Sequence, residues 1–139
     1  MTQKYIKDDL VMTRIEPNNF TPNGVVCKFV DYERRDKVLL RTINGIDGFI
    51  VKKDQFVPIP LTPEILEKNG WYGATHSKQS DDNTKILYKT FKRKGYPTIK
   101  VSQDLKITCE LSPFIVKLES VSDLQHLLFG LGLNSEMEV

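Results

Sequence analysis

Two segments of the chain carry complete helix signals, and strand patterns dominate the rest. In PIPLTPEILEKNGW, Thr62 suits the N-cap, the proline after it suits the first helical position, and Gly70 suits the C-terminal turn. In SVSDLQHLLFGLGLNSEMEV, Ser120 and Asp123 have the spacing of a capping box, and apolar residues recur at helical intervals. The sequence therefore predicts two short helices far apart in the chain.

The first sixty residues have the pattern of a small β structure. Residues 1–9 are polar and are expected to form a poorly ordered arm. Short apolar runs predict strands at 10–15, 25–30, 38–43, 48–51 and 56–59. Asn44-Gly45 between two of them favours a tight hairpin turn. Strands at this density favour a curled sheet or a small SH3-like barrel.

The second part of the chain predicts a separate antiparallel sheet. The polar segment 73–84 has the composition of an exposed loop, and the final NSEMEV reads as a turn into a short strand. Strands are predicted at 85–92, 98–101, 105–111 and 114–118. The fold class is α+β, with a β-barrel-like lobe at 1–60 and an α+β lobe at 61–139. The two lobes are expected to form one compact unit, with the helices covering sheet edges.

Composition is ordinary for a globular protein, with a net charge of only +2. Cys27 and Cys109 lie in predicted strands and are expected to be buried, reduced residues. The start of the chain lacks the apolar core of a signal peptide, and no apolar run approaches the length of a membrane span. We expect a cytoplasmic protein without membrane association, in the host cell if a phage encodes it.

The usual reaction centres are not recognisable in the sequence. The two histidines, His76 and His126, lie apart, and no Cys or His set has zinc-site spacing. No phosphate-binding glycine loop is present. The pairs Asp8-Asp9 and Asp81-Asp82 fall in segments predicted to be flexible and solvated. We therefore expect a protein that is not an enzyme and that has neither a cofactor nor a metal.

One stretch, YKTFKRKGYPTIK, interleaves cations with aromatic residues. Cations for phosphate and aromatic faces for stacking are what single-stranded nucleic acid requires. Exposed hairpin lysines that block edge aggregation give the same pattern. A second basic turn, YERRDK, contains Arg34 and Arg35. The candidate contacts for a nucleotide, nucleic acid or other anionic ligand are Arg34, Arg35, Lys89, Lys92, Arg93, Lys94 and Tyr96.

The last predicted helix has more apolar residues than a narrow stripe needs, including Leu127, Phe129 and Leu131. This excess fits either a helix packed on two sides or a surface for self-association. A homo-oligomer through this helix, or a protein partner, is therefore a second expectation.

The two helix segments resemble those of a family of small uncharacterised proteins of Bacteroidetes, their phages and related mobile elements. Its members carry an IPLTEEILLKxGF-like helix, matched here by 59–71, and a VHQLQNLYFALTGEELEI-like end, matched by 121–139. Trp71 replaces the usual phenylalanine, and Ser122 replaces the usual histidine. The match covers about 35 residues, mostly packing positions. The resemblance implies a phage or mobile-element accessory protein and carries no catalytic residue.

The expected function is that of a non-catalytic binding protein of phage or mobile-element origin that acts by occupying a partner or ligand. Three narrower possibilities stay open. The protein is a counter-defence protein that sequesters a nucleotide signal or blocks a host immune protein, a nucleic-acid-binding accessory factor, or a component of the virion.

Overall fold

The computed structural model describes residues 5–14, 25–45, 47–79 and 85–139. The chain divides into two compact units, Met1–Ile59 and Pro60–Val139. Each unit contains one antiparallel sheet, and both helices belong to the second unit. The described chain is thus α+β, with strands predominating.

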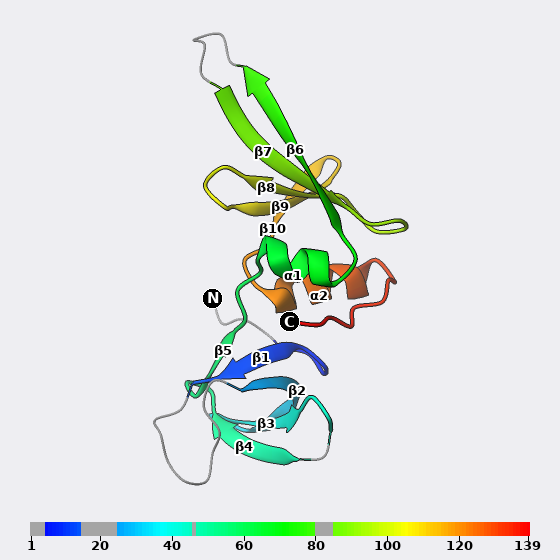
Figure 1. Cartoon of the computed structure of the whole chain (residues 1–139). Helices are drawn as coiled ribbons and strands as arrows, with labels where there is room; N and C mark the ends of the chain where they lie inside the picture. Colours follow the sequence, from blue (N-terminus) through cyan, green and yellow to red (C-terminus); the bar gives the residue numbers. More distant parts are fainter. Residues whose placement is uncertain (1–4, 15–24, 46, 80–84) are drawn as a thin grey trace. The chain divides into compact units, whose positions relative to one another are not determined.

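The first unit is a five-stranded antiparallel sheet with the order β4-β3-β2-β1-β5 (Figure 1). Its strands are β1 Leu10–Thr13, β2 Val26–Arg34, β3 Lys37–Thr42, β4 Gly48–Lys52 and β5 Phe56–Pro58. Each lies at or near a predicted strand, but β2 runs four residues further than the pattern indicates. The pairing of β2 with β3 shifts register after Phe29 and again after Tyr32, which bends the strand.

Alternate side chains of these strands form the core of the first unit. Its buried members are Val11, Cys27, Phe29, Val38, Leu40, Val51 and Phe56. The prediction of a disordered arm at 1–9 is wrong for the described part. Tyr5 packs against this core, and Asp9 is 1% exposed and accepts a 2.9 Å hydrogen bond from the Ile6 amide.

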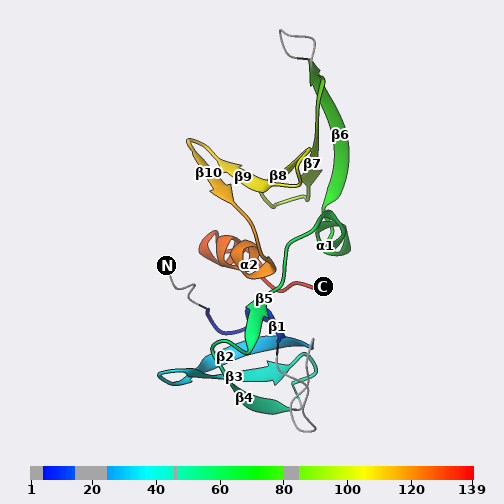
Figure 2. The ribbon, with the colours of Figure 1, turned by 90° about the vertical axis from the view of Figure 1, so that its left-hand side faces the viewer.

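The second unit contains a sheet with the order β10-β9-β8-β7-β6 and two helices (Figure 1). The elements are α1 Pro63–Lys68, β6 Tyr72–Gln79, β7 Lys85–Lys92, β8 Ile99–Ser102, β9 Ile107–Leu111, β10 Phe114–Lys117 and α2 Val121–Gly130. Both helices lie on one side of this sheet rather than over its edges (Figure 2). We call that side the helix face and the opposite side the outer face.

The local helix signals are confirmed. The Thr62 hydroxyl accepts from the Ile65 amide, and Ser120 and Asp123 form the reciprocal capping box. Apolar residues of both helices pack with the helix face. The buried residues of this core include Leu66, Trp71, Phe91, Ile99, Cys109, Leu124 and Leu128.

Two expectations for the strands of the second unit are wrong. Residues 73–79 of the predicted loop belong to β6, while 80–84, with the pair Asp81-Asp82, lie outside the described residues. Leu105 is not a strand residue: its φ is 63° and its side chain is 72% exposed, because Ser102 to Lys106 form a turn.

The end of the chain is held by a side chain instead of by the expected strand. The Asn69 amide donates to the Glu138 carbonyl at 2.7 Å and accepts from the Glu138 amide at 2.8 Å. The same amide group donates to the Ile65 carbonyl at 2.7 Å, so it joins the end of α1 to the tail. An asparagine here does the pairing that a neighbouring strand would do.

Candidate anion-binding surface

Three cations stand in one cross-strand row of the first unit. Arg34 is opposite Lys37 on the neighbouring strand, and Lys37 is opposite Lys52 on the next. The row exists because β2 continues to Arg34 and a two-residue turn returns the chain into β3. Like charges directly opposite each other in a sheet are destabilising.

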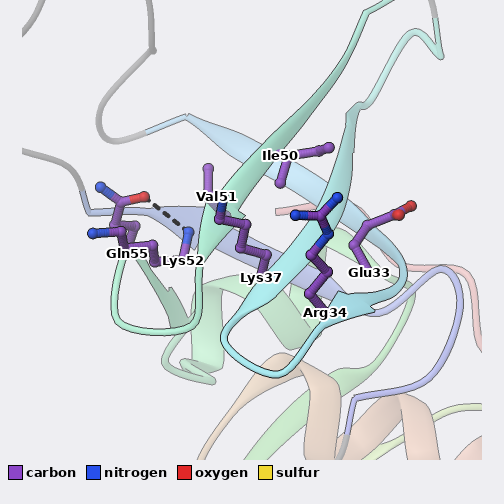
Figure 3. Close-up of a pocket in the computed structure, with 7 residues that line it drawn as sticks. All are labelled: Glu33, Arg34, Lys37, Ile50, Val51, Lys52 and Gln55. Atoms are coloured by element: carbon purple, nitrogen blue, oxygen red, sulfur yellow. Dashed lines mark hydrogen bonds between the residues drawn. The ribbon is translucent and has the colours of Figure 1, made fainter.

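A hollow of about 460 Å³ lies along this row. Its lining is Glu33, Arg34, Lys37, Ile50, Val51, Lys52 and Gln55 (Figure 3). The Gln55 side-chain oxygen accepts from the Lys52 amide at 2.9 Å, which fixes the short turn between β4 and β5. The lining therefore combines three cations and one carboxylate with the apolar residues Ile50 and Val51 of β4.

The three cations have no carboxylate partner among the residues that the structure describes. The one ion pair found there joins Lys106 and Asp104, in the other unit. Glu33 lines the same hollow but lies beyond ion-pair distance of the three cations. The surface thus concentrates positive charge in a concave site, which favours a ligand with clustered negative charge.

Only one of the two arginines predicted for this turn belongs to the site. Arg34 lines the hollow, whereas Arg35 is exposed in the turn and is not part of the lining. Lys37, Lys52 and Gln55 were missed by sequence reasoning. The clue was present in the short DYERRDK turn, since a hairpin there places Arg34 opposite Lys37.

The basic hairpin of the second unit does not form a single binding tip. Phe91 is fully buried in the core, and the Arg93 guanidinium lies over the Tyr96 ring at 3.9 Å. Lys92 projects from the outer face and Lys89 from the helix face, because they are an odd number of residues apart on β7. Lys94 is exposed in the turn. The pattern of alternating cations and rings is thus split between two sides of the sheet.

Outside these two basic segments, the described residues offer few groups that could bind a metal or react. No group of three or more His, Cys, Asp or Glu side chains is arranged for a metal within the described ranges. Both cysteines are free and buried, as predicted, and burial raises the pKa of the Cys27 and Cys109 thiols. None of the described helices is long and apolar enough to cross a membrane.

The last helix has one exposed apolar end. Leu124 and Leu128 are buried against the sheet, whereas Phe129 is 66% exposed and Leu131 is 45% exposed. Some of the many apolar residues of this helix therefore belong to the core, and the others are accessible at the end of the helix. A self-association surface at this end stays a prediction.

Comparisons with protein-family models, with curated proteins and with solved structures find no match for this chain. The family resemblance drawn from the two helix segments therefore stays a prediction. The function of the protein has to be inferred from its own residues and their geometry.

Proposed function

We propose that the protein is a non-catalytic binding protein whose first unit holds a small phosphate-bearing ligand in the hollow along Arg34, Lys37 and Lys52. The observation that carries this proposal is the row of three mutually opposed cations lining a concave site. Phosphate oxygens accept hydrogen bonds from arginine and lysine at once, and Arg34 adds the planar fork suited to them.

The repulsion within the row is itself an argument for a ligand. Adjacent like charges in a sheet lower stability by a few tenths of a kcal/mol or more per pair. A bound polyanion removes that penalty and adds charge-assisted hydrogen bonds. A surface that only needed solubility would not require three cations in register.

Isothermal titration with ATP as the probe tests the proposal, with adenosine as the uncharged comparison. ATP is expected to bind and adenosine is not. Lys37→Gln is expected to weaken ATP binding about tenfold or more, since one charge-assisted contact is lost. The same substitution is expected to raise the unfolding temperature of the free protein, because the central charge of the row is gone.

Arg35→Gln is the matched control for Arg34→Gln, because it removes the same charge one residue away from the lining. Only the Arg34 variant is expected to lose affinity. Equal losses in both variants would show a diffuse charge effect and remove the hollow as the site. Failure of ATP and of inorganic pyrophosphate to bind at low salt would reject the proposal.

The hollow also favours one of the narrower possibilities, a counter-defence protein that sequesters a nucleotide signal. Sequestration needs a basic concave site and no reaction centre, and the hollow supplies the first of these. Tight binding of a cyclic dinucleotide without its conversion, followed by chromatography of the recovered ligand, supports this role. Release of a hydrolysed product contradicts it.

We also infer that the sheet of the first unit curls into an SH3-like barrel. The support is its meander order with β5 beside β1, together with two register shifts in β2. Bulges increase the local twist and allow one strand to bend between two parts of a small barrel. An experimental structure with β4 and β5 far apart would contradict the closure.

A further inference from the structure

The outer face of the second unit's sheet carries exposed aromatic rings in register. Across β6 and β7, Tyr72 is opposite Lys92, and His76 is opposite Tyr88. Tyr72 is 80% exposed, and His76 is exposed as well. On the helix face of the same strands, Trp71 and Phe91 are buried. Tyr72 and His76 are therefore not part of the core, and Tyr88 is half-buried.

His76 and Tyr88 form a fixed pair. Their ring centroids are 5.2 Å apart and their planes differ by 23°, which is a stacked arrangement. The His76 Nε2 atom lies 2.8 Å from the Thr90 hydroxyl oxygen, and the Lys100 ammonium lies 4.6 Å from the Tyr88 ring centroid. A hydrogen bond and a cation thus orient two rings on an open strand surface.

Small side chains separate this pair from Tyr72. Ala74 and Thr90 are opposite each other in the row between them. Tyr72 and His76 are four residues apart on one strand, which corresponds to about 13 Å. With only small residues between them, the exposed Tyr72 and His76 rings are accessible to planar ligands, whereas Tyr88 is half-buried and is covered by the His76 ring and the Lys100 ammonium.

Cations lie on the same face and follow the sheet across its strands. Thr90, Lys100, Thr108 and Lys117 are opposite one another in one row from β7 to β10. Lys92 adds a third cation beside Tyr72. None of these three lysines has an ion-pair partner among the described residues. Glu110 is the acidic residue of the described strands that shares this face, opposite Ile115.

We propose that the outer face of the sheet β6–β10, with Tyr72, Tyr88 and Lys100 at its centre, binds single-stranded nucleic acid. The lysines contact phosphates, and the Tyr72 and His76 rings stack with unpaired bases, while Tyr88 holds the His76 ring in place. A duplex is a poor fit, because its bases are stacked inside and present no free ring face. This site is in a different unit from the hollow and does not depend on the function proposed for it.

Fluorescence anisotropy with a labelled 15-nucleotide oligo-dT tests the proposal. The same measurement with oligo-rU and with a blunt DNA duplex of equal length distinguishes the nucleic-acid class. Both single strands are expected to bind more tightly than the duplex. With three phosphates neutralised, log K is expected to fall with log salt with a slope of about −2.

Substitutions on the face give the sharper test. Tyr72→Ala is expected to weaken binding at least ~5-fold, as expected for the loss of one stacked base. Because this side chain is 80% exposed, the variant is expected to keep the unfolding temperature of the parent. Tyr88→Phe keeps the ring and is expected to retain affinity, whereas Tyr88→Ala is expected to lose it.

Lys100→Gln and Lys89→Gln form a matched pair, since both lysines are exposed but they lie on opposite faces of the sheet. Only Lys100→Gln is expected to reduce the affinity and to lower the salt slope by about 0.7. Equal effects of the two variants, a preference for the duplex, or binding insensitive to salt would each overturn the proposal. Loss of binding through Lys94→Gln with Tyr72→Ala unaffected would place binding at the hairpin tip instead and would also overturn it.

Discussion

The Arg93 guanidinium lies 3.9 Å from the centroid of the Tyr96 ring and 5.1 Å from that of the Trp71 ring. The two rings are themselves in edge contact at 5.4 Å, and the Trp71 indole donates to the Pro97 carbonyl at 3.4 Å. Arg93, which the sequence suggested as a ligand contact, thus holds the turn between β7 and β8 against Trp71, which follows α1.

Arg93→Ala is therefore expected to destabilise the protein by about 1 kcal/mol, the range of a partly shielded cation–π contact. Urea unfolding followed by tryptophan fluorescence measures this change in the free energy of unfolding. Arg93→Lys is expected to keep little of this stabilisation, because an ammonium group does not stack on a ring as a flat guanidinium does. Lys94→Ala in the same turn is the control and is expected to stay within about 0.5 kcal/mol of the parent. A larger effect at Lys94 would contradict this assignment.

Gly73 lies directly against the ring of Phe91. A Cβ atom at this position would be 2.7 Å from the Phe91 Cε1 atom, and that ring is fully buried. Gly73→Ala is expected to cost about 1–3 kcal/mol through overpacking. Gly130→Ala, where nothing lies within 4 Å, is expected to be neutral or to stabilise α2 by up to about 1 kcal/mol. Chemical unfolding measures the stability of both variants. Equal changes in the free energy of unfolding would contradict the close contact between Gly73 and the Phe91 ring.

The amide of Asn69 is expected to control exchange at the end of the chain. Asn69→Ala removes both bonds to Glu138 and the bond to Ile65, with a loss of about 1–3 kcal/mol. Hydrogen exchange by NMR is expected to show faster exchange of the Glu138 amide. Asn69→Asp keeps an accepting oxygen and is expected to retain part of the protection. Unchanged protection in the alanine variant would exclude the clamp.

Leu105 has a left-handed backbone, with φ of 63°, and its side chain is 72% exposed. Such a conformation costs about 1–2 kcal/mol for a residue with a Cβ atom. Leu105→Gly is therefore expected to stabilise the protein by about 1 kcal/mol, since little apolar contact is lost. Gln103→Gly in the same turn is the control and is expected to gain nothing. Thermal unfolding distinguishes the two.

Burial raises the pKa of the Cys27 and Cys109 thiols in the folded protein. A group with a raised folded pKa contributes stability that is complete below its unfolded pKa, about 8.5 for a thiol, and is lost as pH rises through the folded value. The free energy of unfolding is expected to fall above about pH 8.5. In the double variant Cys27→Ala, Cys109→Ala, the free energy of unfolding is expected to fall less steeply with pH. Parallel pH curves for the parent and the variant would show that the thiols do not cause the loss of stability.

The sequence was sufficient where structure is local. Caps at Thr62 and Ser120 and the apolar strand patterns placed both helices and most strands, because those signals depend on neighbours in the chain. Strand β6 was missed because Tyr72 and His76 stand on an exposed face and leave no apolar alternation to detect. Its identity as a strand comes from pairing with β7.

The candidate sites could be anticipated only in part for the same reason. Arg34 was found because basic residues cluster in its turn. Lys52 is fifteen residues beyond Lys37, and only the register of β3 with β4 brings them together. Likewise, the separation of Lys89 from Lys92 comes from the faces of β7, which a list of charges along the sequence does not reveal.

The clamp between Asn69 and Glu138 has a practical consequence for engineering the second unit. This unit begins at Pro60, one short helix before Asn69, and six helical residues span only about 9 Å. Three extended residues and this helix separate the start of the unit from the tail, a span of about 20 Å, so a glycine-serine bridge of about ten residues is long enough to splice them. Circular permutants opened at another surface turn are accordingly a realistic way to reposition a fluorophore or an affinity handle.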